Sequence, residues 1–171
     1  MRVAVLLFAT AAALPTAGAS ERRQAEPDGG DWRFHLYTDE VTGHDITMLV
    51  LPAEVGRSQI MIACEEQELF VLADFGRRLS TEDLDITERL GQAAPIDRRW
   101  EIAKDSWEVL VHPTRGTELL QHLADMEAAR EVSLTVTPDG RPAVRSTFHT
   151  VGLSKMLPRL TGCVPEEPAP F

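Results

Sequence analysis

The chain has 171 residues, 17 of them basic and 27 acidic, and its formal net charge at pH 7 is −10. A surface of this sign repels phosphate backbones and anionic lipid, so nucleic-acid binding is not expected. The length fits one ordinary domain that can bury a core of its own.

The first nineteen residues have the features of a secretory signal peptide. Arg2 supplies a positive start, and residues 3–14 form an apolar run. Ala17 and Ala19 are small residues at the positions that a signal peptidase reads, so cleavage is expected between Ala19 and Ser20. The run is shorter than the roughly twenty residues that span a bilayer, although an uncleaved anchor or a buried strand is the alternative.

Cleavage there predicts export by the general secretory route to the periplasm or beyond the cell. The mature form would keep 152 of the 171 residues and carry no second run of membrane length. Residues 20–31 are polar and contain glycines, which is typical of a flexible arm. Residues 32–163 are expected to form a single β-rich globular domain, and residues 164–171 a tail rich in Pro and Glu.

Strand signals dominate the predicted domain. They cover, in chain order, residues 32–37, 45–51, 59–64, 68–73, 85–90, 106–111, 132–136 and 143–150, the fifth and sixth being the weakest. The first stretch alternates strictly and places Trp32, Phe34 and Leu36 on one face, with His35 on the other. Short loops between consecutive strands favour antiparallel pairing.

Two helices are predicted in the second half of the chain. Residues 117–129 carry an apolar stripe, made of Leu119, Leu120, Leu123 and Met126. The polar residues between them, His122 included, are expected on the opposite face. Residues 151–160 form a shorter candidate that Pro158 disturbs. The fold class expected is therefore α+β, mainly an antiparallel β-sheet or sandwich with one or two helices in the C-terminal half.

Cys64 and Cys163 are the two cysteines of the chain. In an oxidising compartment an even pair predicts one disulfide, and the alternative is two free thiols, one of them reactive.

The sequence offers no catalytic motif. No serine lies in a Gly-x-Ser-x-Gly elbow, and there is no Cys-x-x-Cys. No two of the five histidines have the spacing that pairs metal ligands on a helix, and a His35–His44 pair across a hairpin lacks a third ligand. We therefore expect no catalytic residue, no metal ligand and no cofactor.

Three tryptophans leave two interpretations open. Trp32, Trp100 and Trp107 are expected as core residues, because large aromatic side chains are usually buried. The weaker alternative is a platform on which a ligand stacks.

Several landmarks follow one another along the predicted domain. The first are Trp32, the Thr38-Asp39 pair, and a strand that ends in Cys64 before an acidic turn. The later ones are Arg89, Trp100, Leu-Leu-x-x-Leu at 119–123, Leu-x-Val-x-Pro at 134–138, Phe-x-x-x-Gly-Leu at 148–153 and Cys163. In this order, from about Trp32 to Cys163, the chain resembles the VasI/TagO-like periplasmic accessory proteins associated with type VI secretion systems. It departs at Gly91 and Val164, where members often carry an acid and a tryptophan.

The resemblance implies a non-enzymatic binding or assembly protein whose partner is an envelope or secretion-machine protein. Two alternatives stay open: an exported enzyme that uses His112 or His122 near a carboxylate, and a domain that binds a small ligand or peptide. An enzyme should show a deep pocket in which polar groups converge. A flat apolar surface would favour a protein partner.

Overall fold

The computed structural model describes residues 30–38, 43, 45–104 and 106–164. The predicted signal peptide, the Ala19–Ser20 cleavage point, most of the arm and the tail beyond Val164 lie outside these residues. The described strands are β1 (Arg33–Thr38), β2 (Asp45–Pro52), β3 (Gln59–Glu65), β4 (Glu68–Asp74), β5 (Leu84–Leu90), β6 (Ile96–Ile102), β7 (Val109–Val111), β8 (Glu131–Val136) and β9 (Val144–His149).

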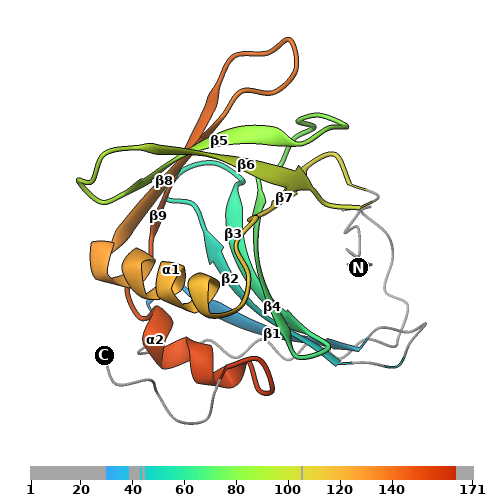
Figure 1. Cartoon of the computed structure of the whole chain (residues 1–171), viewed down its shortest axis with the longest axis vertical. Coiled ribbons are helices and arrows are strands. Elements are labelled where there is room, and N and C mark those ends of the chain that lie inside the picture. Colours follow the sequence, from blue (N-terminus) through green and yellow to red (C-terminus); the bar gives the residue numbers. More distant parts are fainter. Residues whose placement is uncertain (1–29, 39–42, 44, 105, 165–171) are drawn as a thin grey trace.

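These strands form one curled sheet (Figure 1). Their order is β1-β2-β3-β4-β7-β6-β5-β8-β9, and every neighbouring pair is antiparallel. After β4 the chain crosses to β5 and returns through β6 to β7, which pairs with β4. The predicted fold class, an antiparallel sheet with helices late in the chain, is confirmed.

The helices are α1 (Gly116–Ala129), α2 (Leu153–Met156) and the 3-10 turn η1 (Leu157–Arg159). They lie on the inner, concave side of the sheet (Figure 1), where Leu119, Leu123 and Met126 of α1 join the main core. Among the described residues, no helix has the length and hydrophobicity needed to cross a lipid bilayer.

The start of β1 is fastened to the end of β9. The indole of Trp32 donates a hydrogen bond to the carbonyl of Thr150 over 3.3 Å, and the hydroxyl of Thr150 donates to the carbonyl of Met126 over 2.6 Å. Gly30 lies against the same corner with φ of 64°, and a Cβ there would sit 2.4 Å from the carbonyl oxygen of Val151. Only glycine fits that position without a shift of the backbone.

The structure differs from the predicted elements at two places. Residues 96–102 form β6, which the sequence did not suggest. Of the predicted strand 106–111, only Val109–Val111 is extended, because the hydroxyl of Ser106 accepts hydrogen bonds from the backbone N–H groups of Glu108 and Val109 and closes a turn.

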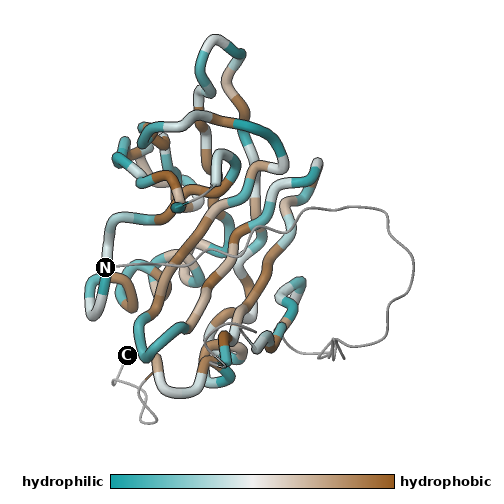
Figure 2. The backbone as a smooth tube through the Cα atoms, turned by 90° about the vertical axis from the view of Figure 1, so that its right-hand side faces the viewer, coloured by the Kyte–Doolittle hydropathy of each residue, from teal (hydrophilic) through white to brown (hydrophobic). Residues whose placement is uncertain are grey.

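One half of the sheet is apolar on both faces. The side of β2, β3, β4 and β7 that points away from α1 is called the outer face here. It carries an outer apolar cluster, made of Met48, Val50, Met61, Ala63, Phe70, Leu72, Ala103, Val109 and Val111. Figure 2 shows long apolar stretches along these adjacent strands.

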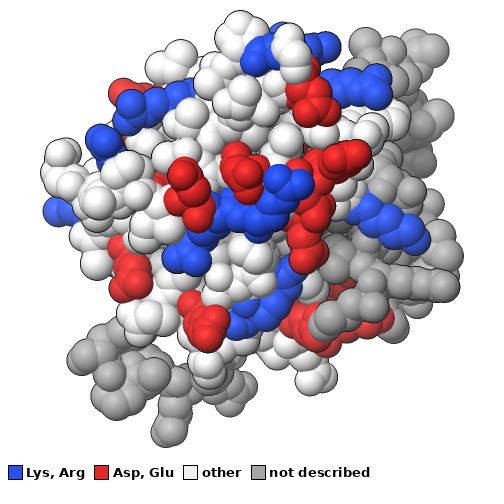
Figure 3. All heavy atoms as spheres, turned by 45° about the horizontal axis from the view of Figure 1, so that its top comes forward, with Lys and Arg blue, Asp and Glu red and all other residues white. Residues whose placement is uncertain are grey.

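The other half of the sheet follows the usual alternation of an antiparallel sheet. On the outward side of β5 and β6, Arg99 pairs with Asp85 at 3.5 Å and the hydroxyl of Thr87 donates to Asp97 over 2.6 Å. Figure 3 shows basic and acidic side chains intermixed on this side of the molecule. The contrast marks the outer face of β2–β4 and β7 as unusual.

Candidate functional site

Polar side chains from β6, from α1 and from the residue after β7 converge on Glu88 of β5. His122 of α1 donates from Nε2 to Glu88 Oε1 over 3.0 Å. On the other carboxylate oxygen, Oε2, Arg98 Nε lies at 3.4 Å and His112 Nε2 at 3.9 Å, which is longer than a hydrogen bond. Glu88, His112 and His122 are buried, and the rings of the two histidines stack with centres 4.5 Å apart.

The cluster keeps its carboxylate ionised. Burial alone would raise the pKa of Glu88, but the two neighbouring histidines outweigh burial and lower the pKa from 4.5 to about 2. For His112, burial is the main cause of a pKa below the ordinary value of 6.5, and the attraction of Glu88 opposes it only in part. At neutral pH, Glu88 is therefore an anion and His112 is neutral.

Glu88, His112 and His122 offer ligand atoms that all lie within 4.8 Å of one another, a spacing that a metal ion could bridge. The tautomer of His112 argues against this use. Its Nδ1 accepts a hydrogen bond from the backbone N–H of Thr114 over 3.1 Å, so a neutral ring carries its proton on Nε2. A metal bound at Nε2 would need the proton on Nδ1, where the N–H of Thr114 already points. His112 is therefore better suited to donate a hydrogen bond from Nε2 than to bind a metal ion there.

The arrangement suits an internal ion cluster. Glu88 of β5 is surrounded by groups that donate or carry positive charge, and they come from β6, the residue after β7 and α1. Three buried atoms near it, Arg98 Nε, Trp100 Nε1 and His112 Nε2, have no hydrogen-bond partner among the described residues. The exported-enzyme alternative is thus right about proximity, since both histidines lie near a carboxylate, but these groups are buried and face one another.

The sequence had placed His122 on the polar face of its helix, and that prediction was wrong. A stripe at i, i+3, i+4 and i+7 runs through Leu119, His122, Leu123 and Met126, and all four are buried. Glu88 was missed for a related reason, since it shares the buried side of β5 with Ile86. The available signal was a titratable residue, Glu88 or His122, at a position that the apolar pattern of its element assigns to the core.

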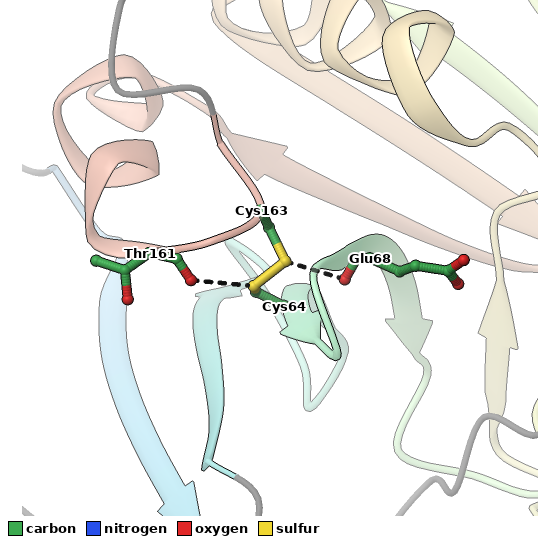
Figure 4. The surroundings of a disulfide bond; sticks show 4 residues. All are labelled: Cys64, Glu68, Thr161 and Cys163. Carbon is green, nitrogen blue, oxygen red and sulfur yellow. Dashed lines mark hydrogen bonds between the residues drawn. A yellow bond between two sulfur atoms is a disulfide. The ribbon is translucent and has the colours of Figure 1, made fainter.

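The predicted disulfide is present (Figure 4). It joins Cys64, the second-to-last residue of β3, to Cys163, which follows η1. The two cysteines are 99 positions apart in the sequence. Cys64 Sγ lies 3.5 Å from the carbonyl oxygen of Thr161, and Cys163 Sγ lies 3.2 Å from that of Glu68. The bond ties the C-terminal segment to the edge of the β3–β4 hairpin.

A groove of about 720 Å³ opens beside this disulfide. Its lining consists of Phe34, Leu36, Gly43, Asp45, Thr47, Cys64, Glu66, Gln67, Arg159 and Thr161. Leu36, expected beside Trp32 and Phe34, is 51% exposed here, and the guanidinium of Arg159 lies 4.1 Å from the ring centre of Phe34. The groove is shallow, and both polar and apolar side chains line it.

The three tryptophans do not share a surface. Trp32 and Trp100 are buried, whereas Trp107 is 45% exposed with the guanidinium of Arg78 over its ring at 5.3 Å. The core interpretation holds for the first two, and these side chains do not offer a common platform to a ligand.

Comparisons with known proteins bear on the fold. No protein-family model and no curated protein sequence matches the chain. Among solved structures, the chain is similar to the crystal structure of invasion associated protein B from Bartonella henselae, with a TM-score of 0.54 and 12% sequence identity. The match covers 81% of this chain and 94% of that chain, so the two share an overall fold.

Proposed function

We propose that this chain is an exported, non-enzymatic binding or assembly protein that docks another protein of the cell envelope against its outer face. The observation that carries the proposal is the outer apolar cluster. β2, β3, β4 and β7 have apolar side chains on both faces, and most of the outer cluster is buried within the chain. Its half-buried members, Met48, Val50 and Val109, are the side chains that a partner would contact.

The remaining features support the same proposal. The disulfide agrees with an oxidising compartment, which the predicted signal peptide also implies. Glu88, His112 and His122 are buried, which favours a structural role for them over a catalytic one. A place beside a type VI secretion system follows from the resemblance to VasI/TagO-like proteins and is part of the proposal.

A photo-crosslinking residue placed at Met48 tests the proposal in cells. Met48 lies on the outer face and is half-buried. The matched control is Val55, which is 81% exposed in the loop between β2 and β3. We expect a protein adduct from position 48 in the envelope fraction and none from position 55. A protein that gives no adduct from position 48 would rule out the outer face as a docking surface.

The groove beside the disulfide favours a second candidate, a domain that binds a small ligand or peptide. Its volume of about 720 Å³ lies within the range of small-molecule sites, roughly 300–1,000 Å³. In the variant Leu36→Arg, the longer side chain on β1 would fill the groove. This variant should lose ligand binding in the groove and keep the crosslink from position 48.

A further inference from the structure

Four loops meet at the end of the sheet that lies away from the disulfide, in the upper part of Figure 1, and are called the loop surface here. They follow β2, β4, β6 and β8 and comprise residues 53–58, 75–83, 103–104 with 106–108, and 137–143. The backbone N–H of Leu79 donates to the carbonyl of Trp107 over 2.7 Å, and the carbonyl of Leu79 accepts from the N–H of Asp139 over 3.3 Å. A Cβ at Gly76 would lie 2.8 Å from the Cβ of Arg57. The loop after β4 thus contacts each of the other three.

Trp107 is the exposed aromatic residue of the loop surface. Its side chain is 45% exposed, although its backbone is held by Leu79. The guanidinium of Arg78 lies 5.3 Å from the centre of the indole ring, within the range of a cation–π contact, and Arg78 is exposed as well. Tryptophan and arginine are the residue types that often contribute most to binding at protein interfaces.

Basic side chains predominate among the exposed charges around Trp107. The exposed basic residues of the loop surface are Arg57, Arg77, Arg78, Lys104 and Arg141, and its exposed acids are Glu54, Glu82 and Asp139. Over the whole chain the acids outnumber the bases, 27 to 17, so the balance of exposed charge is reversed here.

The arginines of the loop surface have no acid of their own. Within the part of the chain that the structure describes, no ion pair joins any of them to a carboxylate. The half-buried Asp74 and Asp83 accept hydrogen bonds from the backbone N–H groups of Gly76 and Ile102, over 2.7 and 2.9 Å. The exposed Asp139 accepts one from the hydroxyl of Ser80 over 2.7 Å. The guanidinium groups can therefore pair with carboxylates from outside the chain.

From this arrangement we infer that the loop surface binds a short acidic segment of a protein partner, which packs on Trp107 and pairs its carboxylates with the arginines. Arginine and carboxylate form charge-assisted, often bidentate hydrogen bonds. A short segment fits better than a membrane or a long polyanion, because the net charge of −10 repels an extended anionic surface. The inference does not use the outer apolar cluster and so does not depend on the proposed docking face.

A capped hexaglutamate peptide that carries fluorescein is the probe, and its fluorescence anisotropy measures binding to the oxidised chain at low salt. Arg77→Ala combined with Arg78→Ala should weaken binding about tenfold. Trp107→Ala removes no charge and should also weaken it about tenfold, which simple charge attraction does not predict. The matched control is Arg33→Ala combined with Arg89→Ala, two exposed arginines outside the loop surface, and it should stay within about twofold of the wild type.

Circular dichroism checks that each variant is folded, and Arg57→Ala combined with Arg141→Ala, which leaves Trp107 and Arg78 in place, keeps the test valid if another variant is not. The inference is overturned if hexaglutamate binds no more tightly than a capped hexaserine peptide, or if Trp107→Ala binds like the wild type. Binding to phosphatidylglycerol vesicles without binding to the peptide also overturns it, since the ligand would then be a lipid headgroup. A chain that binds the peptide but gives no crosslink from position 48 supports this inference and contradicts the proposed function.

Discussion

His122 on α1 donates a hydrogen bond to Glu88 on β5 over 3.0 Å, and both side chains are buried. The contact fixes the long helix to the sheet through a buried charge. Removing one partner of such a contact destabilises the fold, because the other partner stays buried without a compensating group.

Glu88→Gln should therefore destabilise the fold while preserving its shape. A hydrogen bond to a charged group contributes about 1.5–3 kcal/mol, and we expect the free energy of unfolding to fall by that amount. Urea denaturation followed by circular dichroism measures it. Glu82→Gln, at an exposed acid in the turn before β5, is the control and should change stability by less than about 0.5 kcal/mol. Equal effects of the two substitutions would contradict the ion cluster.

The same cluster predicts sensitivity to acid. The folded pKa of His112 is lowered, so the fold favours its neutral form, and stability should begin to fall as the pH drops below 6.5. The pKa of Glu88 falls from 4.5 to about 2, so its contribution is complete above pH 4.5 and is lost between pH 4.5 and 2. That lowering corresponds to about 3 kcal/mol. Urea midpoints from pH 7.5 down to about pH 2 measure both steps, and Glu88→Gln should remove the lower one.

The disulfide should contribute a large share of the total stability. It closes a loop across 99 positions, and in the chain-entropy model a loop of about 100 residues gives roughly 4.7 kcal/mol. Cys64→Ala, Cys163→Ala and reduction should each lower the melting temperature markedly. The double variant should be no worse than either single variant, because one bond is lost in all three. Additive losses in the double variant would show that each cysteine stabilises the fold separately.

Export predicts a defined N-terminus. Protein recovered from the periplasm should begin at Ser20, because cleavage is expected after Ala19. N-terminal sequencing and intact mass measurement check this. Recovery of the chain in a membrane fraction with Met1 still present would identify the segment as an anchor.

Much of the fold could be predicted from the sequence, because most of its strands are clear apolar runs or alternate between apolar and polar residues. β3 and β4 are nearly continuous apolar runs, which indicates strands covered on both faces. β6 was missed because its outward residues are charged and Arg98 breaks the apolar alternation on the inward side. That arginine points toward Glu88, and such a pairing between separate strands cannot be read from either strand alone.

The site was harder to predict than the fold, for a physical reason. Glu88, Arg98 and His122 lie on three separate elements, and only the pairing of β5 with β6 and the packing of α1 on the sheet bring them together.

The hydrogen bond between Trp32 and Thr150 joins the start of the domain to its late part, which constrains the order in which the domain folds. Trp32 precedes β1 and Thr150 follows β9, 118 positions later, so this corner closes only when the end of β9 is in place. Contacts between such distant positions slow folding, because a long chain segment must be ordered before they form. The corner between β1 and β9 should therefore be among the last parts of the domain to close.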